Sequence, residues 1–221
     1  SLNNFDEAKI YLKKAIELNP NYSNSYFSLS FVYFVSKNYK DAEKCLHFAV
    51  RYANNIKVKS IYYKNIGDFY ADVHDYKKAE QYFKEAVKIN PRLMNPYFSL
   101  GVLYADKIKN ISKAIEYLEK AIEIYPDYPE TYIQLGGIYA RNLNDYNKSE
   151  IYYNQAIQLD SSQGEAYQGL GYICFEKTHD FQRAIDLYNK AISEDSTLYF
   201  SYYAIGKLLS DYLDKNNEAI L

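Results

Sequence analysis

The 221-residue sequence has no tryptophan, one methionine, two cysteines, five prolines and eight glycines. So few prolines and glycines argue against a collagen, a linker-rich chain or an all-β protein with a turn every ten residues. The cysteines, Cys45 and Cys174, lie far apart and lack metal-ligand spacing. They argue against a disulfide framework or a zinc site and favour a reducing compartment, the cytoplasm. No run approaches the roughly 18 apolar residues of a membrane-spanning helix, so we expect no membrane span.

An excess of one charge sign is also missing. The formal net charge of −2 argues against a nucleic-acid binder that works by bulk electrostatics. The charges are unevenly divided: residues 1–93 carry 15 Lys+Arg against 10 Asp+Glu, whereas residues 94–221 carry 11 against 18. This division is either drift along a solvated surface or a polarity that favours head-to-tail assembly.

What the sequence does have is an internal repeat. Six segments share the pattern aromatic-x-x-aliphatic-small-x-x-large, and their leading tyrosines lie 37, 34, 35, 35 and 35 residues apart. These leading residues are Tyr26, Tyr63, Tyr97, Tyr132, Tyr167 and Tyr202. A second pattern, small-x-x-x-large-x-x-Ala, follows the first five segments and also opens the chain at Ala8. Prolines follow three copies of the second pattern, where proline ends a helix.

The two patterns together resemble the tetratricopeptide repeat (TPR), and the resemblance covers essentially the whole chain. It implies an all-α fold, a right-handed superhelical solenoid of antiparallel helix pairs. Positions 4, 7, 8 and 11 of each first helix share one face, and a single pair cannot bury both of its faces, so pairs must stack. We expect one array over residues 1–221, with a partial repeat 1–22, full repeats 23–59, 60–93, 94–128, 129–163 and 164–198, and a partial repeat 199–221.

Some segments depart from the pattern. From the third repeat on, the turn between the two helices carries one extra residue, as in 107–111. The junction within Arg51 to Ser60 carries three extra residues and predicts either a longer helix or a bent joint. The chain opens in a second helix, Phe5 to Asn19, and is expected to end inside one, Asn217 to Leu221. Both ends then look like cuts through a longer array, so we expect self-association through uncapped ends.

The sequence contains no recognisable catalytic motif. There is no HExxH helix, phosphate loop, dinucleotide fingerprint or nucleophile elbow. The pairs His74-Asp75 and His179-Asp180 invite a proton-relay interpretation, but solvated turn residues explain them better. We therefore expect no enzymatic activity, no cofactor and no metal.

Within the TPR family, the face opposite the packing residues lines a concave groove in which peptides or helices dock. The residues predicted to line this groove are Phe27, Phe31, Phe34, Lys64, Asn65, Asp68, Phe98, Gln134, Arg141, Tyr172, Phe175 and Tyr203. The first three phenylalanines share one helix stripe, so we expect them to be the apolar anchors of an interface. The alternative is that the preceding partial repeat covers them or that they pack within the curved interior.

Two modes of recognition known in the family fit this sequence poorly. A carboxylate clamp is disfavoured because Asp68 stands where that mode needs an asparagine, and only Asn65 and Gln134 approach an asparagine ladder. The expected function is a non-catalytic protein–protein interaction scaffold that binds a protein or peptide and no nucleic acid. The alternative is a substrate-recruiting arm of a larger enzyme whose catalytic domain lies outside this sequence.

Overall fold

The computed structural model describes the backbone of residues 2–218 and the side chains of residues 4–211, and this part is helical without strands. Its contacts divide the chain into two compact units, with the boundary between Lys109 and Asn110. Unit 1 contains α1 (Leu2–Leu18), α2 (Ser23–Val35), α3 (Tyr39–Arg51), α4 (Ile56–Asp72), α5 (Tyr76–Ile89), α6 (Met94–Leu103) and the π-helical segment η1 (Tyr104–Ile108). Unit 2 contains α7 (Ile111–Ile124), α8 (Pro129–Arg141), α9 (Tyr146–Leu159), α10 (Gly164–Ile173), the π-helical segment η2 (Cys174–Thr178), α11 (Phe181–Glu194) and α12 (Tyr199–Glu218).

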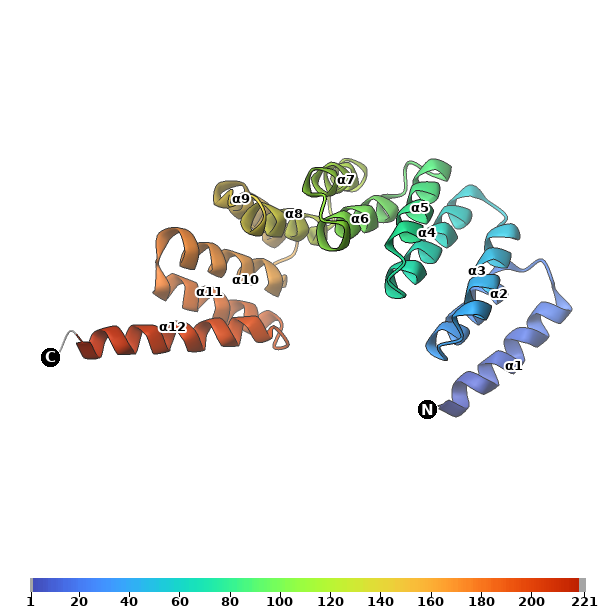
Figure 1. Cartoon of the computed structure of the whole chain (residues 1–221), viewed down its shortest axis with the longest axis horizontal. Helices are drawn as coiled ribbons and strands as arrows, with labels where there is room; N and C mark the ends of the chain where they lie inside the picture. Colours follow the sequence, from blue (N-terminus) through green and yellow to red (C-terminus); the bar gives the residue numbers. More distant parts are fainter. Residues whose placement is uncertain (1, 219–221) are drawn as a thin grey trace. The chain divides into compact units, whose positions relative to one another are not determined.

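Consecutive helices pack as antiparallel pairs within each unit (Figure 1). The pairs are α2 with α3 and α4 with α5 in unit 1, and α8 with α9 and α10 with α11 in unit 2. Neighbouring pairs touch through α3 and α4 in unit 1 and through α9 and α10 in unit 2. The expected all-α array of helix pairs is confirmed. Among the described residues, none of the helices combines the length and apolar character that a bilayer crossing requires.

Small residues let the two helices of a pair approach closely. A Cβ added at Gly67 would lie 2.5 Å from the ring of Phe83, and one at Gly171 would lie 2.9 Å from the ring of Tyr188. Contacts below about 3 Å are not tolerated in close-packed interiors, so these first-helix positions must stay small. The alanine that ends the second pattern is fully buried in the five copies from Ala49 to Ala191. The packing face predicted by the repeat is therefore present.

Two further rows of first-helix residues are buried although the pattern did not single them out. The residue just before each leading tyrosine is buried in all six copies, namely Ser25, Tyr62, Pro96, Thr131, Ala166 and Ser201. The residue six positions after each leading tyrosine is buried too, namely Val32, Phe69, Leu103, Ile138, Ile173 and Leu208. Each first helix therefore buries a wider arc than its amphipathic pattern indicates.

Hydrogen bonds also link neighbouring pairs in unit 1. The Tyr70 hydroxyl on α4 donates to the Glu43 carboxylate on α3. The Tyr104 hydroxyl donates to Oε1 of Glu80 on α5, at 2.6 Å. Burial, together with the bond to Glu80, raises the pKa of Tyr104 to about 12, so this phenol stays a donor at neutral pH.

The turn inside each pair has one recurring geometry. One residue adopts a left-handed backbone and the next residue caps the second helix with its side chain. The left-handed residues are Lys37, His74, Lys109, Asn144 and His179. The caps that follow them are Asn38, Asp75, Asn110, Asp145 and Asp180. The histidine–aspartate pairs thus belong to turns in which the carboxylate accepts from a backbone N–H, as the solvated-turn interpretation expects.

The left-handed turn residues supply a test, because none of them is glycine. Lys37 has φ 58°, a conformation that costs an L-residue about 1–2 kcal/mol and costs glycine almost nothing. Lys37→Gly should therefore raise the free energy of unfolding by roughly 0.5–1 kcal/mol, after allowance for the looser unfolded chain. Urea unfolding followed by circular dichroism measures the change.

Lys44→Gly is the matched control for this test, because Lys44 lies inside α3. There the same replacement should lower stability by about 1 kcal/mol. A Lys37→Gly protein that is also destabilised would contradict the turn geometry.

The extra turn residues and the long junction are resolved in different ways. The third and fifth repeats absorb their extra residue in η1 and η2, whereas the fourth places it in the turn after α8. At the long junction the longer-helix alternative holds, since α4 has 17 residues against 13 in α2. The expected break before Asn217 is absent because α12 continues to Glu218; residues 219–221 lie outside the described part.

Candidate functional site

The structure gathers eight of the twelve predicted groove residues into two pockets, one in each unit. Phe27, Phe31, Phe34, Asn65 and Asp68 line the first, which we name the aromatic pocket. Gln134, Arg141 and Tyr172 line the second, which we name the polar pocket. Lys64, Phe98, Phe175 and Tyr203 line neither pocket.

The aromatic pocket lies between α2 and α4 and has a volume of about 270 Å³. Its full lining is Phe27, Ser30, Phe31, Phe34, Leu46, Asn65, Asp68, Phe69 and Asp72. Four of these nine residues are phenylalanines, and the polar ones lie mostly on α4. The pocket thus combines an apolar wall with a polar wall, as is usual for sites that orient a ligand.

The three phenylalanines of α2 have different surroundings. The Phe27 ring stacks on Tyr62 of α4, with centroids 5.1 Å apart, and Phe34 meets the edge of Phe69 at 5.8 Å. Phe31 is 59% exposed. Phe27 and Phe34 therefore hold α2 and α4 together, and Phe31 is the ring that is open to a partner.

The polar wall of this pocket carries a partly compensated negative charge. Nζ of Lys64 lies 2.6 Å from Oδ2 of Asp68, one turn away on α4. Burial raises the pKa of Asp68, Lys64 opposes that rise, and the neighbouring carboxylate of Asp72 adds to it. Asp72 is exposed on the rim of the pocket.

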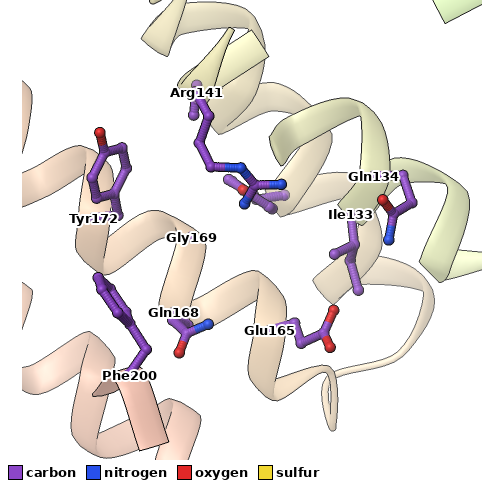
Figure 2. Close-up of a pocket in the computed structure, with 10 residues that line it drawn as sticks. Ile133, Gln134, Arg141, Glu165, Gln168, Gly169, Tyr172 and Phe200 are labelled. Carbon is purple, nitrogen blue, oxygen red and sulfur yellow. The ribbon is translucent and has the colours of Figure 1, made fainter. Parts of the chain in front are cut away.

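The polar pocket lies within unit 2 and has a volume of about 490 Å³. Residues of α8, α9, α10 and α12 line it: Ile133, Gln134, Ala140, Arg141, Tyr153, Glu165, Gln168, Gly169, Tyr172 and Phe200. Figure 2 shows Arg141 and Gln134 facing the cavity from α8, with Gln168 and Glu165 opposite them on α10. Tyr172 and Phe200 form its aromatic end.

Two glycines shape this cavity. A Cβ at Gly169 would lie 2.2 Å from Cζ of Tyr153, so only glycine lets that ring reach the wall between α8 and α10. A Cβ at Gly137 would lie 2.6 Å from Nη2 of Arg141, so the guanidinium lies against the backbone of its own helix. The two glycines thus leave room for both side chains in the positions that they occupy.

The polar groups of this pocket can bind both donors and acceptors. The Ser201 hydroxyl donates to Oε1 of Gln168 at 3.1 Å, which leaves the Gln168 amide nitrogen facing the cavity (Figure 2). Burial raises the pKa of Tyr153 to about 12, against the influence of Arg141, so its phenol is protonated at neutral pH. Arg141 and Gln168 offer N–H groups and Glu165 offers a carboxylate, a set that matches the C=O and N–H groups of a peptide main chain.

Comparison with known families identifies the repeat. Three models described as tetratricopeptide repeat match residues 11–44, 60–127 and 129–163, which together make up more than half of the chain. The chain belongs to the tetratricopeptide repeat family. A search of curated protein sequences gives no match.

Solved structures with the TPR fold are similar to this chain. A chain in the crystal structure of the APC/C hetero-tetramer Cut9–Hcn1 has a TM-score of 0.72 at 16% identity, over 94% of this chain and 40% of that one. YrrB, described as a TPR protein with an unusual peptide-binding site, has a TM-score of 0.61 at 19% identity, over 87% of this chain and 96% of its own. The human IFIT1 dimer with m7Gppp-AAAA has a TM-score of 0.74 at 19% identity, over 92% of this chain and 49% of that one. The TPR chain thus spans less than half of the Cut9–Hcn1 chain, and these likenesses show the fold alone.

The four predicted residues outside the two pockets have different surroundings in the TPR array. Lys64 pairs with Asp68, and Phe175 packs 6.0 Å from Phe181. Tyr203 is 62% exposed on α12, and Phe98 is half-buried on α6.

Asp72, Glu165, Gln168 and Phe200 also line the pockets. They lie on the first-helix face opposite the packing residues but were not among the twelve residues singled out from the sequence. Phe69 and Tyr153 carry no such signal, because both belong to rows that pack between helices. Only the folded TPR pairs show that their rings also reach a pocket.

The two cysteine side chains of the TPR array are buried and unpaired. Burial raises the pKa of the Cys45 thiol to about 11 and also raises that of Cys174. Both thiols are therefore protonated at neutral pH, the weakly reactive form. Among the described residues, no group of three or more His, Cys, Asp or Glu side chains could hold a metal ion.

Proposed function

We propose that this TPR array is a non-catalytic protein-interaction scaffold that binds a peptide or a helix through the aromatic pocket of unit 1. The observation that carries the proposal is Phe31, which lines the aromatic pocket and remains 59% exposed while its neighbours Phe27 and Phe34 are packed. An aromatic ring exposed beside a pocket is typical of an interface anchor. TPR proteins are typically non-catalytic scaffolds, which supports the absence of an enzymatic role.

The polar pocket of unit 2 supports the same function by other means. Arg141, Gln168 and Glu165 face one cavity with both donors and acceptors, and Tyr172 and Phe200 offer an apolar end. Such a lining suits an extended peptide, whose main chain needs paired hydrogen bonds and whose side chains need apolar contacts.

The test of this function begins with a partner identified by mass spectrometry after pulldown with the intact protein. Isothermal titration calorimetry with that purified partner then compares the wild type with Phe31→Ala. We expect the loss of the anchor ring to weaken binding by about 2 kcal/mol, while the helical circular dichroism spectrum stays unchanged. Phe27 is left intact because it stacks on Tyr62 and its removal would disturb the helix pair.

Ile56→Ala is the matched control, because Ile56 is 67% exposed in the same unit and does not line the pocket. Its affinity for the partner should equal that of the wild type. Equal affinities for the wild type and Phe31→Ala would refute the proposed site.

Three further expectations remain predictions. Self-association through the array ends would use exposed rings such as Tyr199, 81% exposed, and Tyr202 on α12. Location in the cytoplasm rests on the two unpaired, buried cysteines. The absence of nucleic-acid binding rests on the net charge of −2.

A further inference from the structure

The charged side chains that line the aromatic pocket, among the residues that the structure describes, are all negative. They are the carboxylates of Asp68 and Asp72, and no described lysine or arginine lines the pocket. This contrasts with the surrounding sequence, since residues 1–93 carry 15 Lys+Arg against 10 Asp+Glu. The negative charge is thus a local property of the pocket. The surrounding part of the chain has a net positive charge and would not attract a basic partner over a long range.

The two carboxylates are incompletely neutralised within the free protein. Asp68 and Asp72 lie one helical turn apart on α4, a spacing at which like charges destabilise a helix by a few tenths of a kcal/mol. Lys64 makes its ion pair with Asp68, and among the described residues Asp72 has no ion pair. One cation therefore faces two carboxylates on this wall, and a second cation would relieve their repulsion.

The opposite wall is also suited to a cation. The exposed ring of Phe31 lines the same pocket as Asp68 and Asp72. The faces of aromatic rings attract ammonium and guanidinium groups within about 6 Å of the centroid. The long alkyl stems of lysine and arginine pack on apolar surface while the charged ends reach polar groups. The volume, about 270 Å³, is just below the roughly 300–1,000 Å³ of whole-ligand sites and suits a side chain better than a complete small molecule.

We propose that the aromatic pocket receives an arginine or lysine side chain of a partner peptide, with its stem against Phe31 and its charged end between Asp68 and Asp72. This inference rests on the proposed function and names the chemistry of the partner at that site. A guanidinium fits especially well, because it stacks on an aromatic face and forms paired hydrogen bonds with a carboxylate. An acidic peptide would meet two carboxylates that share the single cation of Lys64 and is disfavoured.

The test uses random 12-residue peptides displayed on phage and selected against the intact protein. The enriched peptides should contain an arginine or lysine next to an apolar residue. One such peptide is then synthesised with arginine and with citrulline at that position, since citrulline keeps the shape and loses the charge. Fluorescence polarisation with the wild-type protein should give a dissociation constant about tenfold higher for the citrulline peptide than for the arginine peptide.

Asp72→Asn provides the second arm of the test, because it removes one carboxylate from the pocket. With this variant the dissociation constants of the arginine and citrulline peptides should lie within about twofold of each other. Such a loss of discrimination shows that the peptide arginine interacts directly with the Asp72 carboxylate. Asp106→Asn is the control: Asp106 is an exposed acid of unit 1 outside the pocket, and its removal changes the net charge equally. The tenfold preference for arginine should persist in this control.

Two outcomes distinguish failure of this inference from failure of the proposed function. If Phe31→Ala abolishes binding of the selected peptides but citrulline binds as well as arginine, the basic side chain is overturned and the peptide site stands. If the selection yields no peptide that depends on Phe31, the proposed function itself is overturned. Enrichment of acidic peptides at this pocket would also overturn the inference.

Discussion

Gly136→Leu should destabilise unit 2 by roughly 3 kcal/mol, the upper part of the range for overpacked cores. A Cβ at Gly136 would lie 2.8 Å from Cε1 of Tyr153, and leucine adds three more carbon atoms in the same place. Tyr153 cannot move away easily, because its ring is also held against Gly169. Urea unfolding followed by circular dichroism gives the free-energy change.

Gly206→Ala is the control for this prediction. Gly206 occupies the same repeat position in α12, but an added Cβ there has no described atom within 4 Å. Alanine should therefore stabilise this helix by roughly 0.5–1 kcal/mol, because glycine is a poor helix former. If Gly136→Leu unfolds like the wild type, the assignment of the close helix contact is wrong.

Leu100→Ala should destabilise unit 1 by about 3 kcal/mol. Leu100 has no exposed surface, and truncation of a buried leucine costs its transfer free energy and leaves a cavity, for a total of about 2–5 kcal/mol. In a repeat array each pair is stabilised mainly by its neighbours, so the loss should be concentrated near α6. Amide hydrogen exchange measured by mass spectrometry should show faster exchange in α5 and α6 than in α2.

The comparison for this prediction is Leu18→Ala, at a leucine that is 77% exposed on α1. Stability should change there by less than about 0.5 kcal/mol. Similar losses for the two leucine variants would show that the apolar repeat position does not face the core.

Periodicity predicted the helix pairs well because every repeat has the same spacing of small and large packing residues. Gly67, Gly136 and Gly171 each stand opposite a large ring, as the spacing of small and large residues indicates. The π-helical segments could not be predicted in the same way, since an extra residue can widen a helix end or lengthen a turn at similar cost. The chain uses both solutions, with η1 and η2 in two repeats and a longer turn after α8 in the other.

The candidate site was predictable in its residue types and less so in its geometry. The stripe Phe27, Phe31 and Phe34 was visible in the sequence, but the sequence does not show that Phe27 stacks on Tyr62 and Phe34 on Phe69. Those contacts lie across two helix pairs, and the partner rings, Tyr62 and Phe69, belong to the buried rows that the repeat pattern did not single out. Phe31 differs from its neighbours through three-dimensional contacts and not through the pattern on its own helix.

The two kinds of turn described above also bear on how such an array changes length. The turn has one residue with a left-handed backbone and then one side-chain cap, both when a π-helical segment precedes it and when none does. A residue gained or lost at this end of a repeat is therefore absorbed before the second helix begins, and the spacing of the next pair is preserved. Single-residue insertions and deletions have a tolerated place here, whereas the same change inside α3 or α9 would rotate the remaining side chains by about 100°. Homologous chains should consequently differ in length at these turns first.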